Sequence, residues 1–179
     1  MNKRLQKTLG CFVFLWAFGG LVNPQAAAQS SASFAYGEAG RWAAGVVLGA
    51  PSALTAKHWK NTLQAYQFGL GYDVDRHVTV YGDHLWHFPE VPGQMNIEAQ
   101  GLVPYIGVGG LVRVFTDAGP RNRDNEGRNI RILFRVPLGV EWMIPQVPLA
   151  LFVELAPGVR ILPNLTGEFG GGLGLRYYF

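Results

Sequence analysis

Cysteine is almost absent from this chain, since its one copy, Cys11, lies within the first thirty residues. The rest of the sequence therefore excludes a disulfide framework and a thiolate metal site. Serine is also scarce, and a serine nucleophile needs a base within hydrogen-bond reach. Beyond residue 28 the serines are Ser30, Ser31, Ser33 and Ser52, and His58 is the histidine nearest to Ser52 in sequence. We therefore predict no catalytic residues.

Long apolar runs are also absent after residue 29. The richest stretch, Val147 to Leu162, is interrupted by two prolines and two charged residues. A transmembrane helix requires about 20 consecutive, predominantly apolar residues. The sequence therefore excludes helical spans from this part of the chain.

The N-terminus has the residue order of a secretory signal peptide. Lys3, Arg4 and Lys7 precede an apolar run from Leu9 to Val22, and a group of alanines ends at Ala28. Small residues at both recognition positions predict cleavage after Ala28. The alternative, a membrane-anchor helix, is disfavoured because the run is shorter than the ~20 residues of a span.

Removing this leader also removes the excess of positive charge. The whole chain has 15 basic and 12 acidic residues, and the part after residue 28 has 12 of each. A balanced charge gives no argument for nucleic-acid binding. We expect residues 1–28 to be the signal peptide, residues 29–40 a flexible lead-in and residues 41–179 a folded barrel domain.

What the chain does have is glycine and alternating apolar residues. It contains 24 glycines, and 49% of its residues are hydrophobic. Successive side chains of a strand point to opposite faces. In Gly167 to Phe179 one face is apolar and ends in aromatic residues, and the other is small or charged. In an exported chain this pattern leaves a soluble periplasmic β-domain or a membrane barrel whose outer face meets lipid.

Eight segments carry this alternation. Single-chain bacterial barrels have even strand numbers, which agrees with eight. Sixteen strands of ~10 residues would need about 160 residues before any loop, which is more than the chain has after residue 28. The segment 53–60 has the weakest pattern. We expect bulges or strand ends at Pro104, Pro137 and Pro157, because proline removes a ladder donor. The predicted strands cover residues 41–50, 53–60, 64–73, 77–88, 103–115, 130–144, 149–160 and 167–179.

If the apolar faces point outward, a set of charged residues points into the barrel. An eight-stranded interior is just wide enough to be filled by side chains. We expect these charges to pair and fill it, because an unpaired buried charge is costly. Glycines beside them, such as Gly139 and Gly174, would make room for long arginine and glutamate side chains. The predicted lumen charges are Asp83, Arg113, Arg131, Arg135, Glu141, Glu154, Arg160, Glu168 and Arg176.

Aromatic residues near the strand ends are candidates for an interfacial belt, with plain core packing as the alternative. The belt candidates are Trp42, Trp86, Trp142, Tyr177 and Phe179. Histidines could indicate a metal site, but the alternation places His84 on the face opposite His77, Asp83 and His87. We predict no metal and no cofactor.

Five segments together carry a resemblance that covers most of residues 41–179. They are YGDHLWHF (81–88), PYIGVGG (104–110), RVPLGVEW (135–142), PLALFVELAP (148–157) and GGGLGLRYYF (170–179). The sequence resembles the small eight-stranded outer-membrane β-barrel proteins of Gram-negative bacteria, and more narrowly a largely uncharacterised family of short exported barrels. The resemblance implies an all-β, antiparallel, up-and-down transmembrane barrel and brings no catalytic residues. The segment Thr116 to Asn129 is a longer loop than the resemblance leads us to expect.

These expectations lead to a protein of the cell outer membrane with a structural or surface-interaction role and a side-chain-filled lumen. The alternatives are a narrow pore or small-solute transporter, a lipid-modifying outer-membrane enzyme, and a soluble lipocalin-like barrel. We expect a monomer that contacts outer-membrane lipid and lipopolysaccharide, offers Thr116 to Asn129 to the outside and has no nucleic-acid partner. The barrel-assembly machinery is expected to recognise the C-terminal strand ending at Phe179.

Overall fold

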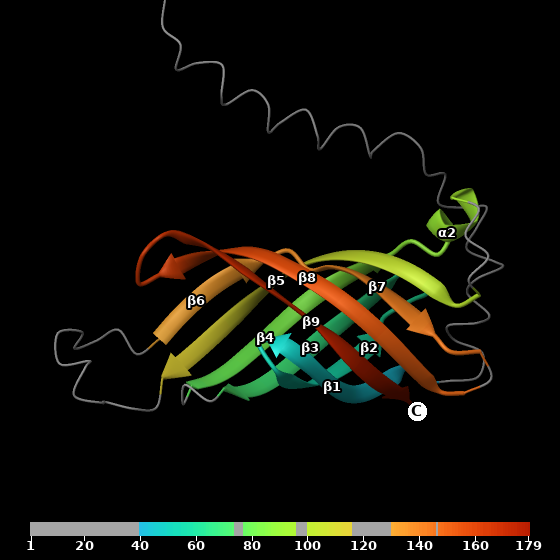
Figure 1. The fold of residues 1–179 in the computed structure, drawn as a ribbon, viewed down its shortest axis with the longest axis horizontal. Helices are drawn as coiled ribbons and strands as arrows, with labels where there is room; N and C mark the ends of the chain where they lie inside the picture. Colours follow the sequence, from blue (N-terminus) through green and yellow to red (C-terminus); the bar gives the residue numbers. More distant parts are fainter. Residues whose placement is uncertain (1–39, 74–76, 96–99, 116–129, 146) are drawn as a thin grey trace, which may run out of the picture.

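The strands of the chain close into a barrel (Figure 1). The structure is a computed structural model that describes residues 40–73, 77–95, 100–115, 130–145 and 147–179. The predicted signal peptide and nearly all of the predicted lead-in therefore lie outside the described residues. The strands are β1 (Trp42–Ala50), β2 (Ala53–Trp59), β3 (Gln64–Asp73), β4 (His77–His87), β5 (Leu102–Phe115), β6 (Ile130–Arg135), β7 (Leu138–Met143), β8 (Leu149–Leu162) and β9 (Thr166–Tyr178), with a short helix, α2 (Val91–Gln94), between β4 and β5.

All strand pairs are antiparallel, and pairing of β1 with β9 closes the barrel. The weakly patterned segment 53–60 does form a strand, β2, which pairs with β1 and β3. No helix in the described part of the chain is long and apolar enough to cross a membrane.

β6 and β7 are two segments of one interrupted strand. Counted as one, they give the barrel the eight strands that the sequence predicts. Both halves pair with β5 on one side and with β8 on the other. Arg135 lies opposite Gly109, and Leu138 lies opposite Ile106, so the register on β5 is unbroken across the gap. The interruption falls at Pro137, which cannot donate a ladder hydrogen bond.

The predicted strand end is therefore confirmed at Pro137 and wrong at Pro104 and Pro157, which lie within β5 and β8. In an antiparallel ladder the N–H and C=O of one residue point to the same neighbour. The carbonyl of Pro157 accepts from the N–H of Val136, 2.9 Å away. The backbone nitrogen of Pro157, which carries no hydrogen, therefore faces the gap between β6 and β7. The carbonyl of Pro104 accepts from Phe88, just past the end of β4, at 2.8 Å. Each proline thus faces a place where the neighbouring strand has stopped.

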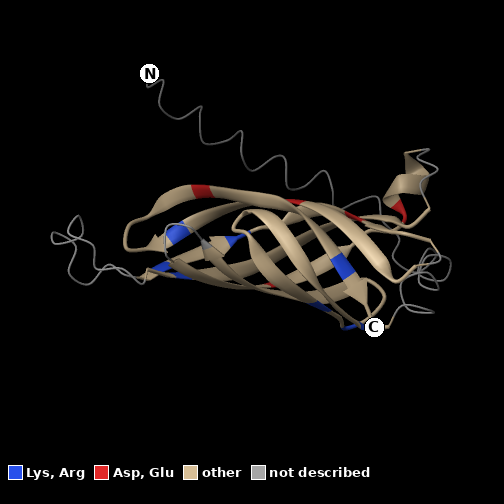
Figure 2. Ribbon diagram, turned by 60° about the horizontal axis from the view of Figure 1, so that its bottom comes forward, with Lys and Arg blue, Asp and Glu red and all other residues tan. Residues whose placement is uncertain are grey.

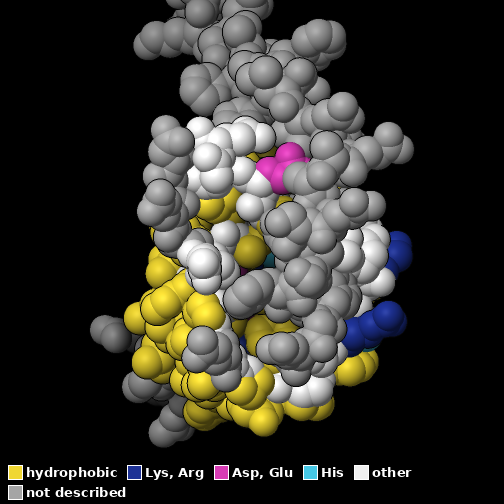
Figure 3. Space-filling view, turned by 90° about the vertical axis from the view of Figure 1, so that its right-hand side faces the viewer, with side chains coloured by type: hydrophobic (Ala, Val, Ile, Leu, Met, Phe, Trp, Pro, Cys, Tyr) yellow, Lys and Arg dark blue, Asp and Glu magenta, His cyan; other side chains and the backbone are white. Residues whose placement is uncertain are grey.

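The two faces of the barrel wall differ as the alternation predicts. Phe134 and Leu173 on the outer face are 49% and 56% exposed, whereas Arg135 and Glu154 on the inner face are 4% and 5% exposed. In the space-filling view onto the terminal end, hydrophobic side chains gather on the outside of the barrel, along the lower left and bottom of Figure 3. The apolar side chains are therefore outside and the charges inside.

The two ends of the barrel also differ. We call the end where β1 begins and β9 finishes the terminal end; it lies on the right in Figure 1, beside α2. The far end is the one where β5 finishes and β6 begins, and it lies on the left. The predicted loop 116–129 connects these two strands but lies outside the described residues.

Candidate functional site

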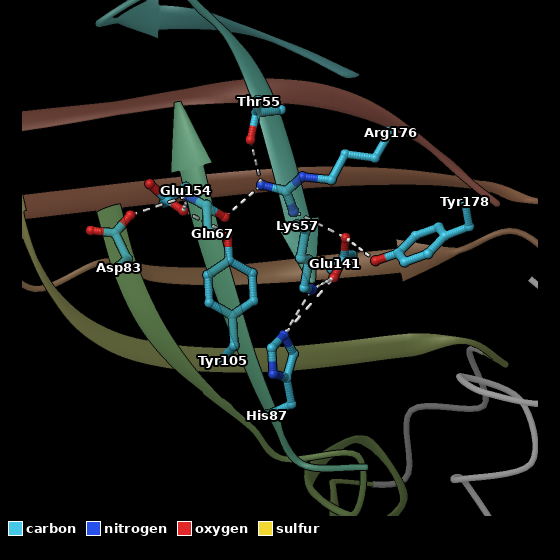
Figure 4. A network of polar contacts seen from close by, with 10 residues as sticks. All are labelled: Thr55, Lys57, Gln67, Asp83, His87, Tyr105, Glu141, Glu154, Arg176 and Tyr178. Atoms are coloured by element: carbon cyan, nitrogen blue, oxygen red, sulfur yellow. Dashed lines mark hydrogen bonds and ion pairs between the residues drawn. The ribbon is translucent and has the colours of Figure 1, made fainter. Parts of the chain in front are cut away.

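The lumen nearer the terminal end holds a cluster built on Glu141 of β7 (Figure 4). Its carboxylate contacts the ammonium of Lys57 and accepts hydrogen bonds from Arg176 at 3.1 Å and from the hydroxyl of Tyr178 at 3.0 Å. Nζ of Lys57 also lies 2.9 Å from Nε2 of His87. The side chains of Lys57, Glu141 and Arg176 are each 0% exposed. Glu141 thus joins two fully buried cations.

A second cluster lies closer to the far end and is built on Arg135 of β6. Its guanidinium donates to both carboxylate oxygens of Asp83 at 2.9 Å, which is the bidentate geometry of a strong ion pair. It also donates to Glu154 at 2.6 Å, and Glu154 accepts from the hydroxyl of Tyr105 at 2.9 Å. The same guanidinium lies 4.3 Å from the ring centre of Tyr81.

Gln67 of β3 joins the two clusters. Its Oε1 accepts from Arg176 at 2.5 Å, and its Nε2 donates to Glu154 at 3.0 Å. The joined clusters contain three cations and three carboxylates, so their formal charges cancel. Such pairing offsets the cost of taking charges out of water. We call these eight residues the lumen network: Lys57, Gln67, Asp83, His87, Arg135, Glu141, Glu154 and Arg176.

Glycines of the inner face make room for aromatic rings. An added Cβ at three of them would overlap a ring. The prediction of room for arginine and glutamate side chains is therefore wrong at the two of these that it named, Gly139 and Gly174. Gly109 instead leaves room for the carboxylate of Asp83. The ring pairs are Gly69 with Tyr81, Gly139 with Tyr105 and Gly174 with Phe152. The rings in turn support the cations, since the guanidinium of Arg176 lies 3.7 Å from the ring centre of Phe152.

Four other predicted lumen residues form the rim of the far end, where basic strand segments gather on the left of Figure 2. Glu168 of β9 lies 3.6 Å from Nη1 of Arg113 and 3.1 Å from Nη1 of Arg160. Their side chains are 17–23% exposed. Arg131 has no ion-pair partner among the described residues, and its guanidinium lies 4.5 Å from the ring centre of Phe115. The predicted set of nine charges is thus divided between the lumen network and the rim.

Ser52 and His58 do not meet. The hydroxyl of Ser52 donates to the carbonyl of Gly49 at 3.1 Å, in the connection that precedes β2. His58 lies six residues further along the strand, which is about 20 Å at the rise of a β-strand. Its ring packs on the outer face, 4.1 Å from the ring centre of Trp42. These two residues therefore cannot act as nucleophile and base.

The histidines are also spread out. His77 and His87 are at opposite ends of β4, and His84 lies on the outer face against Tyr66 and Trp86. Among the described residues, no three His, Cys, Asp or Glu side chains are grouped so that they could hold a metal ion.

The five belt candidates lie at the terminal end, where the register places Trp42, Trp86 and Trp142 near the last or first paired residues of their strands. Four of them are well exposed on the outer face: Trp42 at 49%, Trp142 at 40%, Tyr177 at 52% and Phe179 at 65%. Trp86 is partly exposed and packs against His84. These residues are therefore placed on the outside of the wall at one end.

Lys57 and Gln67 were absent from the predicted lumen set. The alternation already placed both on inward faces, so the signal was present in the sequence. Lys57 lies in the segment with the weakest pattern, and Gln67 carries no charge. The structure shows them as central, with exposures of 0% and 1%.

Comparison with known proteins identifies the fold alone. The chain matches no protein-family profile and no curated protein. It is similar to the crystal structure of the N-terminal β-barrel domain of Pseudomonas aeruginosa OprF, with a TM-score of 0.56 and 17% sequence identity. The match covers 79% of this chain and 100% of that domain.

Proposed function

We propose that this chain is an outer-membrane β-barrel protein with a filled lumen and a structural or surface-interaction role. The observation that carries the proposal is the separation of the two faces, with paired charges inside and exposed apolar side chains outside. Soluble monomers rarely expose apolar patches larger than a few hundred Å². A wall exposing Leu48, Phe68 and Leu173 at 70%, 50% and 56% suits contact with lipid.

The aromatic residues of the terminal end support the same proposal. Tryptophan and tyrosine favour the membrane–water interface because their rings are apolar and their tips are polar. Nε1 of Trp142 donates to the carbonyl of Gln100 at 3.2 Å, which leaves the ring on the outer wall. We propose that these residues lie at a headgroup boundary, in contact with outer-membrane lipid and lipopolysaccharide. The similarity to the β-barrel domain of OprF supports this at the level of fold.

The proposal also includes how the chain reaches this place. The predicted signal peptide would export it, and the barrel-assembly machinery would recognise the strand ending at Phe179. That strand closes the barrel, and the backbone N–H of Phe179 donates to Trp42 at 2.8 Å. A single chain closes the sheet, so we propose a monomer.

Membrane fractionation with a heat-modifiability gel tests this location. We expect the chain in the outer-membrane fraction, extracted by detergent and not by salt, with different mobility before and after boiling. Release into the soluble periplasmic fraction would contradict the proposal and favour a lipocalin-like barrel.

The lumen network favours a filled barrel over the alternative of a narrow pore. The network spans the lumen from β2 and β3 to β7, β8 and β9, and its charged residues are at most 5% exposed. In planar bilayers we expect no steady single-channel openings from the wild-type protein. Steady openings that are lost in Arg135→Ala or Glu154→Ala would instead show that these residues line a conducting path.

The alternative of a lipid-modifying enzyme is tested by analysing the lipid A of a strain that overproduces the chain. We expect this lipid A to be unchanged.

A further inference from the structure

The far end contains a cavity that the lumen network does not fill. It has a volume of about 430 Å³ and is lined by residues at or near the far ends of β1, β4, β5, β6, β8 and β9. This volume lies in the range of small-ligand sites, about 300–1,000 Å³. We call it the vestibule.

The lining of the vestibule is arranged in levels. On β5 and β6, Arg113 and Arg131 lie nearest the far end, Leu111 and Leu133 follow one step deeper, and Arg135 of β6 is deepest. Arg135 is already paired with Asp83 and Glu154, so it closes the vestibule without offering a free charge. The middle level is apolar, and the rim is cationic.

The charge of the rim is unbalanced, in contrast to the lumen network. Among the described residues, three arginines face one carboxylate, since Glu168 is shared between Arg113 and Arg160. Arg131 contacts the ring of Phe115 and has no carboxylate partner among the described residues. Nε of Arg113 is buried and has no hydrogen-bond partner in the described part of the chain. An excess of positive charge in a low-dielectric recess concentrates anions.

We propose that the vestibule binds a small water-soluble organic anion, a carboxylate or phosphate ester with a compact apolar body. The anionic group pairs with Arg131 and Arg113 at the rim, where guanidinium groups match planar carboxylate and phosphate oxygens. The apolar body enters between Leu111 and Leu133. The lumen network below stops the ligand, so the site captures it and does not pass it on.

Titration calorimetry of the full chain in phosphatidylcholine nanodiscs tests this, with phenyl phosphate as the probe. We expect binding that is tighter than that of inorganic phosphate, which lacks the apolar body, and no binding of benzyl alcohol, which lacks the anion. Arg131→Gln and Arg113→Gln should each weaken phenyl phosphate binding by about tenfold or more, the effect of one lost charge-assisted hydrogen bond.

Lys60→Gln is the matched control, because it removes one positive charge from an exposed turn at the terminal end. It should leave binding unchanged, and all variants should keep the heat-modifiable mobility of the folded barrel. The proposal is overturned by absence of phenyl phosphate binding, by equal binding of benzyl alcohol, by unchanged binding in both arginine variants, or by equal weakening in Lys60→Gln. None of these results would alter the case for a filled lumen, which rests on other residues.

Discussion

At the scale of single residues, the inward side chains of this barrel contact partners that are far away in the sequence. Lys57 and Glu141 are 84 positions apart, and Arg176 and Thr55 are 121 positions apart. Alternation predicts that such residues point inward, but it does not predict which of them meet. Their pairing depends on the stagger of the closed sheet, which no local pattern reports.

Glu141 is the residue whose loss should disturb this pairing most, because it contacts both Lys57 and Arg176. Glu141→Gln would leave Lys57 and Arg176 buried with one carboxylate fewer. Because an uncompensated buried charge is strongly destabilising, we expect a loss of about 3–5 kcal/mol in the free energy of unfolding. Urea unfolding of the refolded protein in lipid vesicles, followed by tryptophan fluorescence, measures this loss.

Glu168→Gln provides the control for that measurement. It makes the same chemical change at the rim, where the carboxylate is 23% exposed and water can solvate its arginine partners. We expect a change of about 1 kcal/mol or less. Equal losses of unfolding free energy in the two variants would contradict the prediction that a buried carboxylate of the network contributes more to stability than an exposed one at the rim.

At the scale of the element, alternation predicted most of the strands because each has one apolar and one polar face. It predicted β2 as a strand although that segment had the weakest pattern. The expectation of bulges or strand ends at proline, which came from its missing donor, was wrong at Pro104 and Pro157, because whether a strand accepts proline depends on where the neighbouring strand stops. A neighbour's end is a property of the sheet and has no signal in the strand itself.

The contact between Gly69 of β3 and the ring of Tyr81 on the neighbouring strand β4 gives a prediction about stability. The three atoms nearest to an added Cβ at Gly69 all belong to the side chain of Tyr81. Gly69→Ala should therefore cost about 1–3 kcal/mol of unfolding free energy through overpacking. In a Tyr81→Leu background the same change should cost much less, because the ring that it would meet has gone.

Gly110→Ala is the control for this double-mutant cycle. An added Cβ there meets only the carbonyl oxygen of Leu133 at 3.7 Å, which is ordinary contact on the outer face. We expect a change within about 0.5 kcal/mol, as at an unstrained surface site. A cost of Gly69→Ala that is equal in both backgrounds would contradict the role of the ring.

For the whole molecule, the account depends on how charge and apolar surface are divided. The balanced lumen network, the cationic rim and the apolar outer wall are three different environments within one sheet. The sequence predicted the division between inside and outside, because it follows from a period of two. It did not predict the further division of the lumen into a neutral centre and a basic rim, because that requires knowing which carboxylates reach which arginines.

The most direct test of the whole account is the accessibility of spin labels on the refolded barrel in lipid vesicles. With Cys11 replaced by serine, single cysteines at Phe134, Leu151 and Leu173 on the outer wall and at Lys60 in the exposed turn can each be labelled. We predict that labels on the wall collide with oxygen dissolved in the lipid and are shielded from a water-soluble nickel complex, whereas the label at Lys60 meets the nickel complex freely. Free access of the nickel complex to the three wall positions would contradict the account.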